Sequence, residues 1–181
     1  MGQLDNKRIA ILVANGFEQV ELTGPKEALE KAGADVHIVS IEKEKVRGWN
    51  HTDWGDEFQV DVPIDQADAQ DFDGLVLPGG QMNPDFLRVN EKAIQFIKNF
   101  DSQDKPIGAI CHGPWSLIEA GLVLNKRMTS YHSIKTDLKN AGADWVDEEV
   151  VIDDGLITSR KPDDIPAFNE AIISAFEEVT A

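Results

Sequence analysis

The chain has 181 residues, and 33 acidic residues against 17 Lys and Arg give it a formal net charge of −16 at pH 7. This charge argues against a stable nucleic-acid complex and against docking on a membrane, because both ligands need a basic protein face. A single cysteine, Cys111, excludes an internal disulfide bond and so indicates a cytoplasmic protein rather than a disulfide-stapled secreted one. The N-terminus also lacks the apolar core of a signal peptide.

The first 41 residues predict a strand, a helix and a second strand. Residues 8–14 form a continuous apolar run, which is typical of a strand buried on both faces of a sheet. Apolar residues then recur with helical spacing over residues 18–32, and Gly33 is placed to end that helix. Residues 35–41 predict the second strand, so the segment as a whole predicts a βαβ unit with a parallel strand pair.

The rest of the chain continues to alternate strands and helices. Residues 43–62 predict a loop with a small antiparallel excursion. Further strands are predicted at residues 73–78, 106–110 and 128–131, and a hairpin at residues 150–158. Helices are predicted at residues 84–100, 115–120, 133–141 and 163–178. Together these elements predict a single α/β domain over residues 1–181, with a mostly parallel central sheet and helices on both faces.

Three predicted loops, at residues 15–21, 78–85 and 111–114, leave the carboxyl ends of parallel strands. Functional sites gather at this edge of open parallel sheets. Cys111 lies there between a buried strand and the start of a helix. Because a helix N-terminus stabilises a thiolate, we expect the pKa of Cys111 to lie below the free value of about 8.5. The alternative is an inert buried cysteine, which is the usual state of a lone cysteine.

Two glycines and a histidine belong to the same loops. Gly79 and Gly80 allow the backbone to approach a ligand closely, and the N–H groups of Gly80 and His112 are candidates for an oxyanion hole. The alternative is an ordinary tight turn. His112 directly follows the cysteine and is a candidate general base, unless it is only a helix-start residue held by packing.

Glu18 and Glu21 are three residues apart and share one face of the first helical turn. Acidic residues suit a helix N-terminus for electrostatic reasons alone. A protonated carboxyl group beside Cys111 would instead donate a hydrogen bond to the thiolate, whereas an ionised one would raise the cysteine pKa.

The predicted antiparallel excursion carries two further features. His51, Asp53 and Asp56 share a loop but lack a recognised metal-ligand spacing, so neither a metal nor another cofactor is expected. Trp49 and Trp54 predict an interface with a second copy of the chain, because aromatic residues are enriched in interface cores. The alternative is that both tryptophans pack on their own domain.

Three segments carry a resemblance to a known family: Phe17-Glu18-Gln19-Val20-Glu21-Leu22, Leu77-Pro78-Gly79-Gly80 and Ala109-Ile110-Cys111-His112-Gly113-Pro114. They resemble the PfpI family of the ThiJ/PfpI superfamily, and the likeness runs nearly end to end. The resemblance implies a flavodoxin-like three-layer fold, similar to that of class I glutamine amidotransferases. It also implies a homodimer that in some members assembles into hexamers.

The resemblance further implies roles for single residues. Cys111 matches the nucleophile, Glu21 matches the acid that hydrogen-bonds it, and Glu18 matches a second acid of the pocket. His112 matches the catalytic histidine of PfpI-type peptidases. Their third catalytic member is a Glu from a neighbouring subunit, and the matching residue here is Asp85, whose side chain is one methylene shorter. The residues expected to bind substrate are Gly79, Gly80, Gly113 and Tyr131.

The activity implied by the resemblance is that of a stress-associated cysteine hydrolase or lyase. Such an enzyme would act on methylglyoxal or glycated adducts, as a deglycase or a glyoxalase III does. The residues fit this chemistry, in which a thiolate attacks a carbonyl carbon while an acid or a base moves a proton. One alternative is a PfpI-type peptidase, and another is a redox-sensing stress protein or holdase chaperone in which Cys111 is oxidised. Glutamine amidotransferase activity is not expected, because no His-x-Glu pair follows the cysteine.

Overall fold

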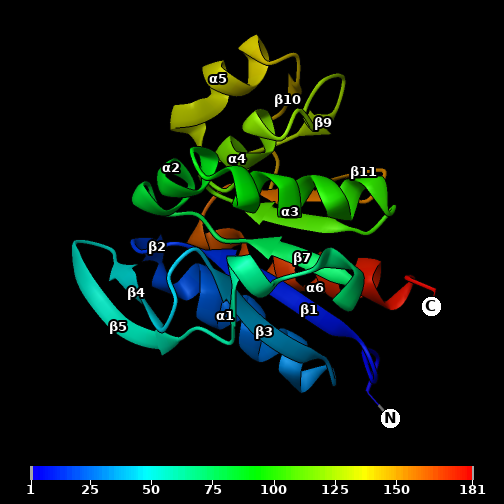
Figure 1. Ribbon diagram of the computed structural model, residues 1–181. Helices are drawn as coiled ribbons and strands as arrows, with labels where there is room; N and C mark the ends of the chain where they lie inside the picture. Colours follow the sequence, from blue (N-terminus) through cyan, green and yellow to red (C-terminus); the bar gives the residue numbers. More distant parts are fainter. Residues whose placement is uncertain (1, 181) are drawn as a thin grey trace.

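A seven-stranded sheet forms the centre of the computed structural model, which describes residues 2–180. Its strands, in spatial order, are β11 (Val150–Asp153), β12 (Leu156–Ser159), β8 (Ile107–Ile110), β7 (Gly74–Leu77), β1 (Arg8–Val13), β3 (Asp35–Ser40) and β6 (Val62–Pro63). All neighbours pair in parallel except β11 and β12, which form the predicted antiparallel hairpin. The carboxyl ends of β1, β7 and β8 therefore lie at one edge of the sheet (Figure 1).

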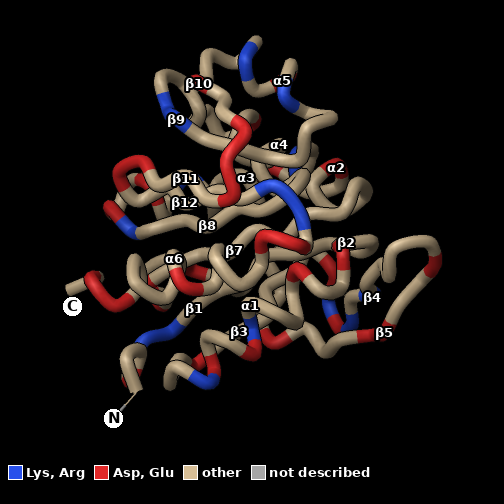
Figure 2. The backbone as a smooth tube through the Cα atoms, turned by 180° about the vertical axis from the view of Figure 1, so that it is seen from behind, with Lys and Arg blue, Asp and Glu red and all other residues tan. Residues whose placement is uncertain are grey.

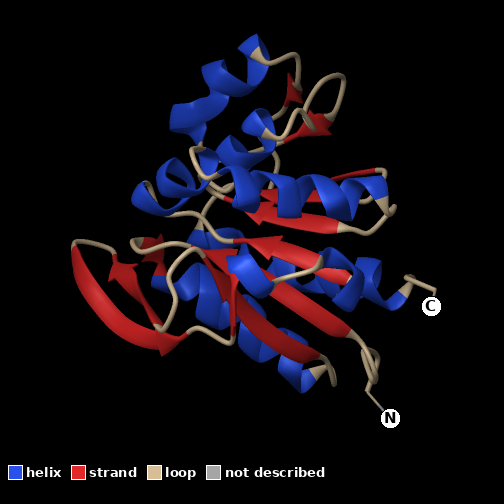
Figure 3. Ribbon diagram, viewed as in Figure 1, coloured by secondary structure: helices blue, strands red, loops and turns tan. Residues whose placement is uncertain are grey.

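Helices cover both faces of this sheet (Figures 1 and 3). One face is covered by α1 (Gln19–Lys31) and α6 (Ile165–Glu177), and the other by α2 (Met82–Arg88), α3 (Glu91–Ser102) and α4 (Pro114–Glu119). Strand β1 shows why both faces are buried: Ile9 and Ile11 belong to the core beneath α6, whereas Ala10 and Leu12 belong to the core beneath α3. The three-layer α/β fold predicted from the alternating elements is confirmed.

The predicted excursion at residues 43–62 is also confirmed. Strands β4 (Lys45–Asn50) and β5 (Asp53–Gln59) pair antiparallel and, with β2 (Phe17–Glu18), form a separate three-stranded sheet. This hairpin projects from the carboxyl edge of the main sheet (Figure 1). The hairpin is therefore placed to extend over the loops that follow β1, β7 and β8.

Two elements differ from the sequence prediction. The helix predicted at residues 84–100 is two helices, because the side chain of Asn90 accepts a hydrogen bond from the N–H of Ala93 and starts α3 anew. The apolar period continues through the break, since both helices pack on the same face of the sheet. The strand predicted at residues 128–131 is the shorter β9 (Arg127–Met128). It pairs with β10 (Asp144–Trp145) in a small sheet of its own rather than joining the central sheet.

Shorter helices complete the fold. They are α5 (Lys135–Asn140) and the single 3₁₀ turns η1 (Ile64–Gln66), η2 (Ala69–Asp71), η3 (His132–Ile134) and η4 (Pro162–Asp164). Among residues 2–180 there is no helix with the length and apolar character needed to cross a membrane. Acidic residues are spread over many parts of the fold rather than gathered in one segment (Figure 2).

Candidate active site

Cys111 stands on a sharp turn between β8 and α4. Its backbone has φ +64°, a left-handed conformation that residues other than glycine rarely adopt. The turn is held from both sides, because the N–H of Cys111 donates to the carbonyl of Ser159 at 3.1 Å and its carbonyl accepts from the N–H of Tyr131 at 2.8 Å. This strand–turn–helix geometry is that of a nucleophile elbow, which presents its side chain above the edge of the sheet.

The glycines around the elbow are required by close packing. A Cβ atom on Gly113 would lie 2.5 Å from the carbonyl oxygen of Leu77, and one on Gly79 would lie 2.7 Å from the Cβ of Cys111. Gly80 has φ +77°, and a Cβ there would lie 2.5 Å from the N atom of Glu18. The turn that follows β7 is thus pressed directly against the elbow, where a side chain on any of these three residues would collide.

Glu21 is completely buried in the first turn of α1. Its Oε1 accepts a hydrogen bond from the N–H of Gly79 at 2.9 Å. The Cys111 thiol lies beside the carboxyl group, and the other oxygen, Oε2, is buried with no other partner among the described residues. Burial, aided by the nearby charge of Glu18, raises the pKa of Glu21 to about 8. Glu21 therefore keeps its proton at neutral pH and has an O–H group free to donate to the sulfur.

The pKa of Cys111 results from opposing effects. Burial raises the pKa of the thiol, and a negative charge on Glu21 raises it further. The backbone N–H groups of Gly80 and His112 point at the sulfur and lower its pKa. Burial outweighs the N–H groups and holds the pKa of Cys111 well above its usual range, so the expectation of an acidic thiol from helix position alone is wrong. A protonated Glu21 removes the repulsion and can donate a hydrogen bond to the thiolate, but burial still opposes the charge.

His112 lies against the sulfur as a neutral base. Its Nδ1 is 3.3 Å from the Cys111 Sγ, and its Nε2 is 3.2 Å from the Oγ of Ser133. Burial and then the charge of nearby His132 lower the pKa of His112 to about 4, so the imidazole is uncharged at neutral pH. In the tautomer that carries the proton on Nε2, this N–H donates a hydrogen bond to the Oγ of Ser133, and Nδ1 is free to accept the thiol proton. Tyr131 stacks on the ring at a centroid distance of 4.9 Å and fixes its orientation.

A cavity of about 710 Å³ opens above the sulfur. This volume suits a small molecule or the side chain of a larger one. The hairpin of β4 and β5 supplies one wall through Trp49 and His51, and the N–H of His51 donates to Glu18 Oε1 at 3.2 Å. The residues that line the cavity are Gly16, Glu18, Glu21, Trp49, His51, Gly80, Gln81, Met82, Cys111, His112, Tyr131, Ser133 and Pro162.

The structure brings together most of the residues singled out in the sequence. Six of them line the cavity: Glu18, Glu21, Gly80, Cys111, His112 and Tyr131. Gly79 and Gly113 lie behind the lining, where they shape the backbone instead of facing the cavity. Asp85 lies away from the cavity on α2, with its side chain 54% exposed and paired with Arg88 of the same chain. Its predicted contribution from a neighbouring subunit stays a prediction.

The sequence did not identify Ser133 as the partner of His112. Trp49 was predicted only at an interface, and His51 was considered only as a metal ligand, so neither was predicted to line the cavity. A single serine two residues after Tyr131 carries no signal of its own. The two hairpin residues reach the cavity only because the small sheet folds over the edge of the large one. Among residues 2–180 there is no group of three or more His, Cys, Asp or Glu residues arranged to hold a metal ion.

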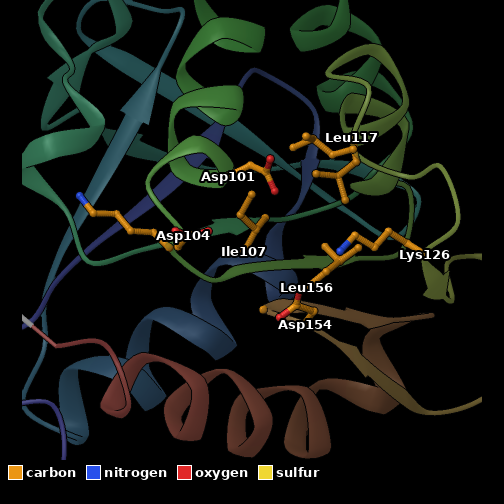
Figure 4. A pocket seen from close by; sticks show the side chains of 10 residues that line it. Asp101, Asp104, Ile107, Leu117, Lys126, Asp154 and Leu156 are labelled. Carbon is orange, nitrogen blue, oxygen red and sulfur yellow. The ribbon is translucent and has the colours of Figure 1, made fainter.

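A second, smaller cavity of about 170 Å³ lies at the other end of β8 (Figure 4). Its lining mixes charges of both signs with apolar side chains and includes Asp101, Asp104, Ile107, Lys126 and Asp154. It contains neither a thiol nor a histidine.

Known proteins share both the sequence and this architecture. The chain is 44% identical over 174 residues to "General stress protein 18" of Bacillus subtilis, an alignment that covers 95% of this chain and 99% of that protein. It is 41% identical over 165 residues to "Protein/nucleic acid deglycase 2" of Escherichia coli, covering 91% and 94% of the two chains. The crystal structure of Drosophila melanogaster DJ-1beta superposes with a TM-score of 0.84 at 30% identity, covering 96% of this chain and 95% of that one.

The family assignment follows from the same evidence. A sequence profile described as the DJ-1/PfpI family matches residues 7–175, which span every strand of the central sheet and the cysteine elbow. The resemblance seen in three short segments thus extends through the fold. The chain is a member of the DJ-1/PfpI family.

Proposed function

We propose that this protein is a cysteine-dependent hydrolase or lyase that acts on methylglyoxal or on the adducts that methylglyoxal forms with amines and thiols. The observation that carries the proposal is the pairing of one thiol with two neutral proton carriers. Glu21 has a pKa of about 8 and His112 a pKa of about 4, so at neutral pH one can donate a proton and the other can accept one. The similarity to a relative named as a deglycase supports the same chemistry.

The first step is addition of the thiolate to the aldehyde carbon. The thiol proton moves to His112 Nδ1, 3.3 Å from the sulfur, and the O–H of Glu21 stabilises the thiolate. A C–S bond forms, the carbonyl π pair moves to oxygen, and that oxygen takes the proton back from His112. The N–H groups of Gly80 and His112, which face the sulfur, stabilise the negative charge on the oxygen before it is protonated.

The product follows without an oxidant or a reductant. After addition, neutral His112 removes a proton from the former aldehyde carbon to give an enediol and returns it to the former ketone carbon, which leaves a lactoyl thioester on Cys111. Water then breaks the C–S bond, so that methylglyoxal plus one water molecule gives lactate and the free thiol. With an amine adduct the former aldehyde carbon is already saturated, so the thiolate displaces the amine there: the C–S bond forms as the C–N bond breaks, and the amine leaves with the proton that His112 took from the thiol. The cavity of about 710 Å³ admits such adducts, and Tyr131 and Trp49 line it with aromatic surface.

The test is product analysis with purified protein and methylglyoxal in a buffer without amines. Lactate formation followed by NMR is expected for the wild type and is lost in Cys111→Ala. Amine adducts should be assayed at several adduct concentrations and one fixed concentration of free methylglyoxal, because the two species interconvert. A rate that follows only the free aldehyde assigns a glyoxalase, and one that rises with the adduct assigns a deglycase. No turnover of either would overturn the proposal.

A second candidate is peptide hydrolysis, which the close contact of Cys111 with His112 favours. Amide cleavage also needs a group that orients the histidine. Within the described chain that group is the hydroxyl of Ser133, whereas Asp85 pairs with Arg88. We expect weak or absent peptidase activity, and Asp85→Glu should raise it selectively if a longer side chain reaches a neighbouring subunit. Efficient peptide cleavage by the wild type, unchanged in Asp85→Ala, would contradict this ranking.

A further inference from the structure

Asn83 is a fully buried polar residue that lies next to the site without lining the cavity. It belongs to the first turn of α2, and its three side-chain hydrogen bonds are with backbone groups. Its Oδ1 accepts from the N–H of Ala14 at 2.7 Å, and its Nδ2 donates to the carbonyls of Pro78 at 2.9 Å and Gly79 at 3.0 Å. Both N–H donors of the amide and its oxygen are therefore in use.

These two carbonyls belong to the consecutive peptide groups that face the catalytic pair. In a trans peptide the carbonyl and the N–H point in opposite directions. The carbonyl of Pro78 points to Asn83, and the N–H of the same peptide, on Gly79, donates to Glu21 at 2.9 Å. The carbonyl of Gly79 points to Asn83, and the N–H of the next residue is directed at the Cys111 sulfur. The N–H of Glu18 also reaches the Gly79 carbonyl, at the longer distance of 3.4 Å. The Asn83 amide is the group that hydrogen-bonds to both carbonyls.

We propose that Asn83 is a positioning residue of this active site: its carboxamide fixes the Pro78–Gly79 and Gly79–Gly80 peptides so that successive N–H groups are aimed at Glu21 and Cys111. This inference rests on the proposed role of Cys111 as a nucleophile and is independent of the substrate.

The two glycines explain why this turn needs the hydrogen bonds from Asn83. Gly79 and Gly80 have no side chains, so their backbone torsions are intrinsically less restricted than those of other residues. Successive N–H groups on one side of a turn form a concave site for negative charge, and they act at full strength only when they are held in place. The Nδ2 group of Asn83 bonds to both carbonyls at once and so prevents either peptide from rotating.

The test is the pH dependence of Cys111 alkylation by iodoacetamide in Asn83→Asp. Burial favours a protonated carboxyl group in this variant, which keeps an acceptor for Ala14 but has a single hydrogen, so at least one of the two carbonyls loses its donor. We expect alkylation at pH 7 to be about tenfold slower than in the wild type, with the profile moved to higher pH. The reason is that the N–H of Gly80 is no longer held toward the Cys111 thiolate, so a hydrogen bond to a charged group is lost. Asn83→Ser, which is uncharged and leaves space for a water molecule, should show a smaller shift in the same direction.

Leu87→Ala is the matched control. Leu87 is a buried apolar residue of the same helix, so its truncation lowers stability without touching the turn. We expect this variant to keep the wild-type alkylation profile. If both Asn83 variants lose stability but keep that profile, Asn83 is merely structural and the inference is overturned. If Asn83→Asp does not fold, the shift in Asn83→Ser decides. The absence of methylglyoxal turnover in the wild type would remove the proposed substrate while leaving this comparison intact.

Discussion

At the scale of single residues, Glu21 controls the charge on the nucleophile. Glu21→Gln removes the negative charge, accepts from the N–H of Gly79 through its amide oxygen and offers an N–H to the sulfur, whereas Glu21→Leu offers nothing. We expect the thiolate of Cys111 to appear at a pH about one unit lower in Glu21→Gln than in Glu21→Leu. Ultraviolet absorbance of the thiolate during a pH titration measures this difference, and identical curves for the two variants would refute the donor role.

The same carboxyl group gives stability a definite pH dependence. The pKa of Glu21 is raised from 4.5 to about 8 by folding, so between these values the folded state binds a proton that the unfolded state releases. The free energy of unfolding from this group therefore falls as pH rises through the window, by up to about 1.4 kcal/mol per pH unit. In Glu21→Gln this decrease in the free energy of unfolding is absent, because glutamine does not titrate.

Urea unfolding of both proteins at pH 5 and pH 8 tests this linkage. Glu21→Gln should gain about 3 kcal/mol relative to the wild type between the two values. The lowered pKa of His112 acts in the opposite direction, because the stability linked to it is lost as pH falls from 6.5 to about 4. Both proteins carry that histidine, so its effect cancels in the difference. A pH-independent difference would mean that Glu21 is ionised throughout.

At the scale of elements, the break between α2 and α3 depends on one cap. Asn90 accepts from the N–H of Ala93 at 3.0 Å. Asn90→Ala should lower the free energy of unfolding by about 1 kcal/mol, and Asn90→Asp should keep nearly all of it, because aspartate caps equally well. Denaturant midpoints measured for the three proteins give the comparison. Equal stability of the alanine variant would show that packing, not the cap, starts α3.

At the scale of the whole molecule, we predict a homodimer. Trp49 and Trp54 pack edge to face with a centroid distance of 5.4 Å. This contact agrees in part with the alternative, in which both tryptophans pack on their own domain. Trp54 is nevertheless 41% exposed, and Phe86 of α2 is 46% exposed, so both leave apolar surface for a second copy of the chain to cover. Light scattering at micromolar concentration should give the mass of a dimer, or of a hexamer built from dimers. A monomer mass would contradict the prediction and remove the route by which Asp85 reaches a neighbouring site.

The sequence alone determined the order of the elements and the place of the nucleophile. Buried parallel strands show as continuous apolar runs, and Cys111 follows such a run and precedes a helix, so the elbow was visible locally. The helix break at Asn90 was hidden because the apolar period continues through it. The turn after β7 could also be predicted from the sequence, since the consecutive glycines Gly79 and Gly80 directly follow a buried strand.

Only the tertiary structure decided the chemistry around the sulfur. The neutral state of Glu21 arises from its complete burial, and burial depends on packing between elements far apart in the chain. Ser133 and His51 reach the cavity from separate loops, and Asn83 holds its turn through contacts with two strand ends. A pKa or a hydrogen bond depends on distance in space, which local sequence patterns describe only within one element.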